Sequence, residues 1–325
     1  HAVADSYRRI IDHALQRNPS AKIFGVTATP NRGDKKGLRE VFDNVADQIR
    51  IAELIASGHL VPPRTFVIDV GVQDALKTVR RVAADFDMGE VDAIMNKSPV
   101  TDAVIAHWKE KAGNRQTVVF CSTVDHACNV ADAFKAEGVS AALIHGEMGD
   151  ADRKATLAAY DRGEIQVITN VAVLTEGWDH PPTSCVVLLR PSSYKSTMIQ
   201  MVGRGLRTVD PEEFPGVVKT DCVVLDFGTS SLIHGTLEQD VDLDGKTSSG
   251  EAPTKACPSC GADIPLASSE CPICGNAFDE EEGGPGVTAT PLSGFLMTEI
   301  DLLKRSSFEW VDLFDSEEAL MATGF

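Results

Sequence analysis

Residues 117–144, TVVFCSTVDHACNVADAFKAEGVSAALI, contain one complete strand–helix–strand unit. The pattern predicts an apolar strand at 117–122, an amphipathic helix at 125–137 that ends before Gly138, and a second strand at 139–144. Two parallel strands need a long crossover between them, usually a helix, whereas antiparallel strands can be joined by a tight turn. The unit therefore predicts part of a parallel sheet.

The same alternation continues on both sides of this unit. Further helices and strands are predicted at 101–113 and 150–161 (helices) and at 165–169, 185–189 and 223–227 (strands). Strands that alternate with helices of about 10–15 residues are typical of an α/β fold, with helices on both faces of a parallel sheet. Upstream, the pattern predicts a helix around Tyr7, a buried strand at 22–29, short helices within 38–60 and a strand at 65–70.

The run QMVGRGLR at 200–207 combines a core-facing pattern with two unbalanced positive charges. If the run is helical, Gln200, Arg204 and Arg207 share one stripe, and Gly203 beside them leaves room for another surface. A second stripe has the spacing of a buried helix face: Ile199, Val202 and Leu206. The first stripe suits phosphate binding, because a guanidinium pairs two oxygens at once. A surface helix with two solvated arginines is the alternative.

Four stretches occur in the order of known helicase motifs: GVTATP at 25–30, VVFCST at 118–123, TEGWD at 175–179 and QMVGRGLR at 200–207. They resemble motifs III, IV, V and VI of superfamily 2 helicases, and the Gln-x-x-Gly-Arg-x-x-Arg of motif VI is intact. The run TPNRGDKKGL at 29–38 and the cysteine pairs described below are similar to DEAH-type DNA-repair helicases of the XPB/RadD group.

This resemblance, together with changes in composition, predicts the domain organisation. The expected parts are the C-terminal end of helicase lobe 1 (1–62, with motif III), an inter-lobe linker (63–95), RecA-like helicase lobe 2 (96–235, with motifs IV to VI), a linker (236–254), a zinc ribbon (255–278) and a small accessory unit (287–325). We expect the accessory unit to be truncated.

The resemblance also implies a nucleotide site. In these motors ATP with Mg²⁺ is held by lobe 1, and motif VI reaches it across the cleft. Arg204 and Arg207 are then arginine fingers on the γ-phosphate, which neutralise charge on the transferring phosphoryl group, and Gln200 orients water or that phosphate. Further contacts to the nucleotide are implied for Gly177, Asp179 and Gly203. For Asp179, a turn residue before two prolines is the alternative.

Two parts of a nucleotide site are missing from the 325 residues. The sequence has no Gly-x-x-x-x-Gly-Lys-Ser/Thr loop to cradle the phosphates, and no Asp-Glu pair ahead of a His to hold Mg²⁺. His1 resembles the final His of an Asp-Glu-Ala-His box and so counts as a candidate nucleotide-site residue, with an arbitrary first residue as the alternative. We therefore expect a nucleotide-binding lobe outside this sequence.

Nucleic-acid contacts are expected in loops that follow the strands of lobe 2. The candidates carry a hydroxyl, amide or imidazole: Ser122, Thr123, His145, Thr169 and Asn170. Such groups bind phosphate oxygens and position DNA without reading its sequence. Polar caps on the following helices are the alternative for each. The resemblance further implies that Thr27 and Thr29 couple the nucleotide cleft to this groove.

The strongest metal-binding pattern is C-x₂-C-x₁₀-C-x₂-C, formed by Cys257, Cys260, Cys271 and Cys274. Four thiolates make a closed tetrahedral Zn²⁺ site, which is structural rather than catalytic. Disulfides are rare in cytosolic proteins, and iron–sulfur clusters usually show other spacings. We read the other four cysteines as buried, small apolar residues.

The charge is distributed unevenly along the chain. The net charge is −18, but residues 236–325 hold 18 acidic and 4 basic residues, a net of −14. Residues 1–235 hold the remaining 30 acidic and 26 basic residues, a net of only −4, which leaves room for a local phosphate-binding groove. No apolar run approaches the ~18–20 residues that span a bilayer, so we expect no membrane partner and a cytoplasmic location.

The sequence as a whole predicts the C-terminal part of an ATP-dependent superfamily 2 DNA helicase or translocase. Its partner would be DNA, as a single strand or a duplex end, with RNA left open. One alternative is the motor subunit of a restriction system, which shares these motifs. The other is a non-catalytic zinc-ribbon adaptor that binds nucleic acid.

Overall fold

The computed structural model describes residues 2–31, 37–82, 85–238, 241, 243–244, 254–256, 263–265, 297–300 and 302–303. Within this part of the chain, the largest element is a seven-stranded sheet in the order β11-β1-β8-β7-β4-β6-β5. Its strands are β1 (Pro63–Ile68), β4 (Thr117–Phe120), β5 (Ala141–Ile144), β6 (Val167–Asn170), β7 (Cys185–Leu188), β8 (Cys222–Asp226) and β11 (Met297–Ile300). All neighbours pair in parallel except β11, which is antiparallel to β1. The predicted α/β fold is confirmed.

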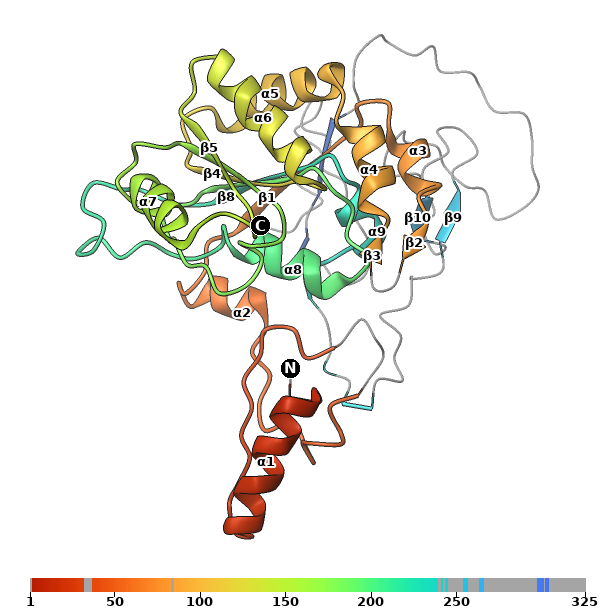
Figure 1. Cartoon of the computed structure of the whole chain (residues 1–325), viewed down its shortest axis with the longest axis vertical. Helices are drawn as coiled ribbons and strands as arrows, with labels where there is room; N and C mark the ends of the chain where they lie inside the picture. Colours follow the sequence, from red (N-terminus) through yellow and green to blue (C-terminus); the bar gives the residue numbers. More distant parts are fainter. Residues whose placement is uncertain are drawn as a thin grey trace, which may run out of the picture.

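Helices cover both faces of this sheet (Figure 1). The helices are α1 (Asp5–Arg17), α2 (Ile51–Ala56), α3 (Gln73–Lys77), α4 (Met88–Met95), α5 (Ser98–Ala112), α6 (Val124–Ala136), α7 (Asp150–Asp161), α8 (Lys195–Gly203) and α9 (Ser230–His234). Helices α5 and α6 lie on one face, and α8 and α2 lie on the other (Figure 1). Two small sheets complete the described elements: β2 (Arg81–Val82) with β3 (Asp85–Phe86), and β9 (Thr254–Ala256) with β10 (Asp263–Pro265).

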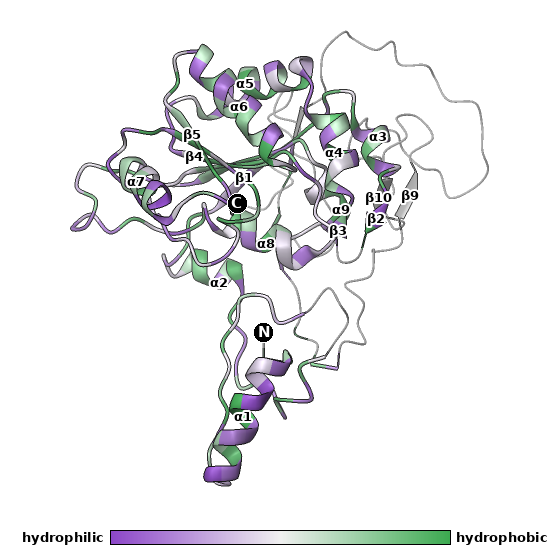
Figure 2. Cartoon of the chain, in the orientation of Figure 1, coloured by the Kyte–Doolittle hydropathy of each residue, from purple (hydrophilic) through white to green (hydrophobic). Residues whose placement is uncertain are grey.

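The core has one apolar cluster on each face of the sheet. On the face of α5 and α6, Trp108 and Phe134 meet edge to face with ring centroids 5.0 Å apart. On the face of α8, Tyr160, Met198 and Val202 are completely buried. The strands between these clusters consist mostly of hydrophobic residues (Figure 2), as is usual for a parallel sheet with helices on both faces.

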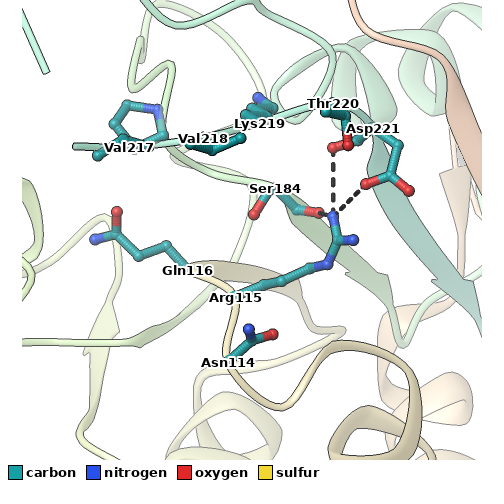
Figure 3. A pocket seen from close by; sticks show the side chains of 10 residues that line it. Asn114, Arg115, Gln116, Ser184, Val217, Val218, Lys219, Thr220 and Asp221 are labelled. Carbon is teal, nitrogen blue, oxygen red and sulfur yellow. Dashed lines mark hydrogen bonds and ion pairs between the residues drawn. The ribbon is translucent and has the colours of Figure 1, made fainter. Parts of the chain in front are cut away.

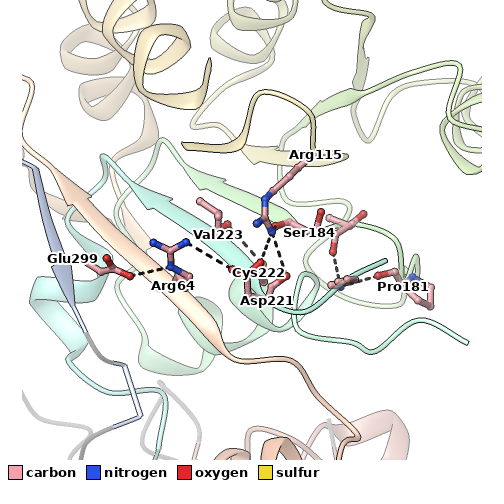
Figure 4. Close-up of polar contacts among 10 residues, drawn as sticks. Arg64, Arg115, Pro181, Ser184, Asp221, Cys222, Val223 and Glu299 are labelled. Atoms are coloured by element: carbon pink, nitrogen blue, oxygen red, sulfur yellow. Dashed lines mark hydrogen bonds and ion pairs between the residues drawn. The ribbon is translucent and has the colours of Figure 1, made fainter. Parts of the chain in front are cut away.

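Strand β11 comes from the segment that the sequence predicted to be a separate accessory unit. It lies at the edge of the sheet, where Ile300 is 4% exposed and Leu302, just beyond it, is fully buried. A chain of ion pairs joins this edge to the middle of the sheet (Figure 4). Arg64 contacts Glu299 at 3.2 Å and Asp221 at 3.8 Å, and Asp221 also contacts Arg115 at 2.6 Å. These described residues therefore belong to the lobe itself.

The segment predicted to be a linker also contributes to the sheet. Strand β1 lies within 63–95 and pairs in parallel with β8 from Pro63 to Val67. Proline is accepted at the first position of a strand, and the four residues that follow Arg64 are buried. The sheet therefore begins inside the expected linker, because β1 has the apolar side chains to join it.

The predicted strand at 22–29 is wrong. These residues have irregular backbone, and Phe24 and Val26 are 80% and 84% exposed. A strand needs a neighbouring strand for its hydrogen bonds, and none of the described strands lies beside this segment. Helix α1 projects away from the sheet and buries no residue (Figure 1). Among the described residues, no helix combines the length and apolar character required to cross a membrane.

Candidate nucleotide and nucleic-acid site

Helix α8 brings the motif VI residues to the edge of the core. Ile199, Val202 and Leu206 are at most 7% exposed, so the predicted buried stripe is confirmed. The helix ends at Gly203, however, and Arg204 is its C-cap residue. The amides of residues 204–206 bond the carbonyls three positions earlier, which tightens the chain beyond the helix. Arg207 therefore does not continue the helical stripe of Gln200.

A single loop, residues 177–180, holds both arginines. Arg204 donates a hydrogen bond to the backbone carbonyl of Trp178, and Arg207 forms an ion pair with the carboxylate of Asp179. Burial, and then the charge of Arg207, lower the pKa of Arg204. The Nε atom of Arg204 is buried and has no hydrogen-bond partner within the described structure. The two guanidinium groups thus converge on adjacent residues of one loop.

The loop geometry depends on glycine at its start. Gly177 has a φ of +73°, in the left-handed region where other residues are strained. Asp179 is 55% exposed at the side chain, and Arg207 is 40% exposed. Two of the predicted nucleotide contacts, Gly177 and Asp179, therefore lie beside the predicted arginine fingers. In this conformation the Asp179 carboxylate is occupied by Arg207.

Aromatic side chains pack against one another in and beside the loop at 177–180. The rings of Trp178 and His180 stack with an interplanar angle of 7°, and Tyr160 lies 4.7 Å from His180 between ring centroids. Thr183 joins this cluster, because its Oγ1 is 3.0 Å from Nδ1 of His180 and 2.9 Å from the hydroxyl of Tyr160. Burial is the main cause that lowers the pKa of His180 to about 4. The loop rests on a packed and largely desolvated base.

Motif VI also contacts the N-terminal segment. Gln200 donates from Nε2 to Oγ1 of Thr29 at 3.3 Å, which links residues 171 positions apart in the sequence. Thr27 supports this turn, because its Oγ1 accepts a hydrogen bond of 3.1 Å from the amide of Thr29. The two threonines predicted to couple the cleft and the groove are therefore connected to the motif VI glutamine.

The two glycines of motif VI have different surroundings. At Gly203 a Cβ atom would meet nothing within 4 Å, so the space beside it is open. At Gly205 a Cβ atom would come within 2.7 Å of Val186 and closer still to Cys222, so this glycine is needed for packing on the sheet. Sequence reasoning singled out Gly203 and missed Gly205, whose tight contact depends on residues distant in the sequence.

The candidates after β4 are engaged within the protein. Ser122 is 3% exposed, and its hydroxyl lies 2.9 Å from Nδ1 of His126. Thr123 caps α6 by accepting from the amide of His126 at 3.1 Å, and its hydroxyl donates to Asp92 at 2.5 Å. The capping alternative thus applies to Thr123, and the buried hydroxyl of Ser122 is not presented to a ligand in this conformation.

The candidates after β6 are buried as well. Thr169 and Asn170 have no exposed area, and their side chains donate to the carbonyls of Ala127 and Val119 at 2.8 and 2.9 Å. Asn170 also accepts from the amide of Leu174 and so holds the turn that follows β6. These two side chains stabilise the interior of the lobe, and they are not part of the proposed nucleic-acid interface.

The candidate after β5 is more accessible. His145 is half-buried at the start of the loop before α7, and its Nδ1 atom is buried without a hydrogen-bond partner among the described residues. Arg153 holds this loop by donating from one terminal nitrogen to three carbonyls, those of His145, Gly146 and Met148. Of the five predicted nucleic-acid residues, His145 and Thr123 are the two that are not fully buried.

Some predicted sites lie outside the described residues. These are His1 and the four predicted zinc ligands, Cys257, Cys260, Cys271 and Cys274. Within the described part of the chain, no cluster of three or more His, Cys, Asp or Glu side chains could hold a metal ion. Three of the other cysteines are buried as predicted, but Cys128 is exposed on α6 because it lies on the helix face turned from the core.

A polar cavity of about 270 Å³ opens at the amino ends of β4, β7 and β8 (Figure 3). Its lining includes Arg115, Ser184, Val218, Lys219 and Asp221. Arg115 is already neutralised, because it donates to the carboxylate of Asp221 at 2.6 Å and to the carbonyl of Ser184 at 3.3 Å. The charge that remains is that of Lys219, whose ammonium group is already bonded to two backbone carbonyls, so the cavity is a weaker candidate than the loop at 177–180.

Comparisons with known proteins identify this lobe. Residues 97–209 match the family described as helicase conserved C-terminal domain. The chain is 28% identical over 260 residues to "Putative ATP-dependent helicase IRC3" of Saccharomyces cerevisiae, and 30% identical over 249 residues to a Schizosaccharomyces pombe relative, irc3. This chain contains a superfamily 2 helicase C-terminal domain. The matches cover 76% and 75% of the chain but only 36% and 39% of the two relatives, so the matched part of the chain spans under two-fifths of their length.

Two further matches concern the fold and the C-terminal region. A solved fragment of a "putative HsdR subunit of a type I restriction enzyme" from Vibrio vulnificus is similar over 75% of this chain and 45% of its own, with a TM-score of 0.54 and 23% identity. At this identity the likeness shows the shared RecA-like fold of helicase lobe 2. Residues 255–280, which include the cysteine pairs, match an uncharacterised protein family, UPF0547.

Proposed function

We propose that this chain supplies the second lobe of an ATP-dependent DNA helicase or translocase, in which Arg204 and Arg207 act on ATP held by a first lobe. One observation carries the proposal. Gln200 bonds Thr29, so the end of α8 that bears both arginines also meets the segment resembling lobe 1. A cleft between two such lobes is where the γ-phosphate would lie.

The chemistry follows from the charges of the site. As the phosphoryl group transfers, negative charge develops on its oxygens, and a guanidinium fork can pair two of them at once. Arg207 and Asp179 are both partly exposed, so a nucleotide phosphate can exchange with the Asp179 carboxylate as the partner of Arg207. Arg204 is more buried and is anchored by Trp178, which suits a fixed contact rather than a mobile one.

The proposal is tested by Arg207→Ala and Arg204→Ala in the full-length protein. Each should lower kcat for DNA-stimulated ATP hydrolysis by about 10³-fold or more, while DNA binding without nucleotide stays unchanged. Lysine at either position should also fail, because an ammonium group cannot reproduce the bidentate fork. Arg162→Ala is the matched control, since Arg162, the C-cap residue of α7, is exposed and paired with Glu164 at 2.6 Å. Turnover within about twofold of wild type in both arginine variants would refute the assignment.

A second test uses the 325-residue chain alone. Its sequence has no phosphate-binding loop and no Mg²⁺-binding carboxylate pair, so it should hydrolyse ATP no faster than background. Substantial DNA-stimulated hydrolysis by the purified chain would show that it carries a complete nucleotide site. The same result would contradict the division of labour between two lobes.

We also propose that DNA passes the loops beside His145 and Thr123, the two candidate residues that are not fully buried. Phosphate contacts of this kind position a strand without sequence preference, so RNA is the competing ligand. Competition between single-stranded DNA and RNA of equal length, at a stated salt concentration, separates the two. Binding stronger to RNA than to DNA would reverse the substrate assignment.

The four cysteines carry a separate proposal, one structural Zn²⁺ per chain. The donor set of four thiolates in two C-x₂-C pairs fits tetrahedral zinc and leaves no open position for chemistry. A zinc ribbon would have the same structural role in a restriction motor, so the metal content does not distinguish a helicase from a restriction motor. A nuclease domain in the full-length protein would favour a restriction motor.

A further inference from the structure

Two prolines leave the loop after motif V short of hydrogen-bond donors. Pro181 and Pro182 have no backbone N–H and so cannot donate to the hydrogen bonds of a strand or helix, although the carbonyls of this stretch still need partners. The missing donors come from Lys219, in the loop between motif VI and β8. Its ammonium group donates to the carbonyls of Pro181 and Thr183, both at 2.7 Å.

Lys219 is well suited to this position. An ammonium group has three donors and no acceptor, so it can bond two carbonyls that face the same point. The residue is half-buried at the rim of the polar cavity, between Val218 and Thr220 (Figure 3). A charged group withdrawn from water costs free energy unless it is hydrogen-bonded, so the two carbonyls and Lys219 satisfy each other.

A continuous set of contacts leads from Lys219 to the arginines. Thr183, held by Lys219 through its carbonyl, binds His180 through its hydroxyl at 3.0 Å. His180 stacks on Trp178, whose carbonyl accepts from Arg204. Asp179, which pairs with Arg207, lies between these two rings in the sequence. Among the described residues, the hydrogen-bond partner of Arg204 and the ion-pair partner of Arg207, Trp178 and Asp179, therefore both lie on the segment that Lys219 fastens.

We propose that Lys219 is a positioning residue for Arg204 and Arg207, a role that rests on the proposed function of these arginines. It fastens the 178–183 segment so that Trp178 and Asp179 present the two guanidinium groups together. Lys219 follows Arg207 by twelve positions. The loop after motif VI therefore returns to the 178–183 segment, which contacts the two motif VI arginines. Burial is the largest effect and lowers the pKa of Lys219 to about 8. Among the smaller effects, Arg207 lowers this pKa and Asp179 raises it.

The test measures ATP hydrolysis by full-length Lys219→Met, with and without Arg207→Ala. Lys219→Met should lower kcat about tenfold and change KM for ATP by less than about twofold, because the arginines act in the transition state. In the Arg207→Ala background the same change should have a clearly smaller further effect, since one of the two guanidinium groups that Lys219 positions is gone. Lys219→Arg keeps several donors and should recover most of the turnover. Lys154→Met, an exposed lysine on α7, is the matched control and should behave as wild type.

A role of Lys219 in folding stability alone gives a different result. It predicts equal fold losses with and without Arg207, in step with a lower Tm, and that outcome would overturn the positioning role. Wild-type turnover of Lys219→Met would do the same. If Lys219→Met unfolds, Lys219→Gln, which keeps two amide donors, is compared in both backgrounds by the same criteria. Near-wild-type turnover of Arg207→Ala alone would instead refute the proposed function and, with it, this inference.

Discussion

Two phenylalanines show how differently the two parts of this chain are built. Phe134 on α6 is completely buried against Trp108, whereas Phe24 in the N-terminal segment is 80% exposed. The difference is that the lobe has strands on either side of each central strand, while residues 22–29 lie beside none of the described strands.

Helices and strands respond differently to that lack of neighbours. Helix α1 forms although it buries no residue, because a helix satisfies its backbone hydrogen bonds within itself. The segment 22–29 stays irregular, because a strand depends on partners for the same bonds. Local structure in the N-terminal segment therefore persists only where it needs no tertiary partner.

The sharpest test of this comparison is the same substitution in both parts. Phe134→Ala should lower the free energy of unfolding by about 3–5 kcal/mol, because it leaves a cavity in a packed core. Phe24→Ala should change it by less than about 0.5 kcal/mol, because the ring is exposed. Urea denaturation of the two variants measures both values. A large loss for Phe24→Ala would mean that the N-terminal segment is packed in solution.

A second substitution tests how far the lobe extends along the sequence. Leu302 is fully buried beside β11, and its carbonyl accepts from the amide of Leu237 at 2.7 Å. Leu302→Ala should therefore cost about 2–5 kcal/mol of lobe stability. Ile10→Ala, on exposed α1, should cost less than about 0.5 kcal/mol. Equal, small effects of both would indicate that the C-terminal strand does not add to the sheet in solution.

Low pH should reduce the free energy of unfolding of the lobe. Burial is the main cause that lowers the pKa of His126 and of His180 to about 4, from an ordinary value of 6.5. The unfolded chain therefore takes up protons first, and stability falls as the pH drops from about 6.5 to about 4. At pH 5 each imidazole should cost about 2 kcal/mol. Unfolding measured from pH 7 to pH 5 checks the slope, which His126→Gln or His180→Gln should make shallower; an unchanged slope in both variants would contradict it.

The smallest effect on the lobe is expected from the predicted zinc site. Cys260→Ser should abolish the binding of one Zn²⁺ per chain but change the unfolding free energy of the lobe by less than about 0.5 kcal/mol. Elemental analysis of protein purified without chelator gives the metal content, and the unfolding of the sheet is followed in parallel. Iron in place of zinc, or no metal in the unsubstituted protein, would contradict the assignment.

Much of the lobe could be predicted from local patterns. Helix α7 has the predicted bounds, 150–161, and α6, β4 and β7 differ from prediction by one or two residues. These elements are read reliably because the apolar period, capping residues and glycines that define them lie within a few positions of each other. The ordered motifs were enough to predict the superfamily, because the residues that define each motif lie close together in the sequence.

The sequence by itself determined the alternation of strands and helices, the buried stripe of α8 and the arginines that follow it. Only the tertiary structure decided which of the candidate polar side chains are buried. Ser122, Thr169 and Asn170 are buried because helices and strands distant in the sequence cover them, and Gly205 is required because Cys222 packs against it. The joining of β11 to β1 and the hold of Lys219 on the motif V loop depend on residues far apart in the sequence, so no local pattern can reveal them.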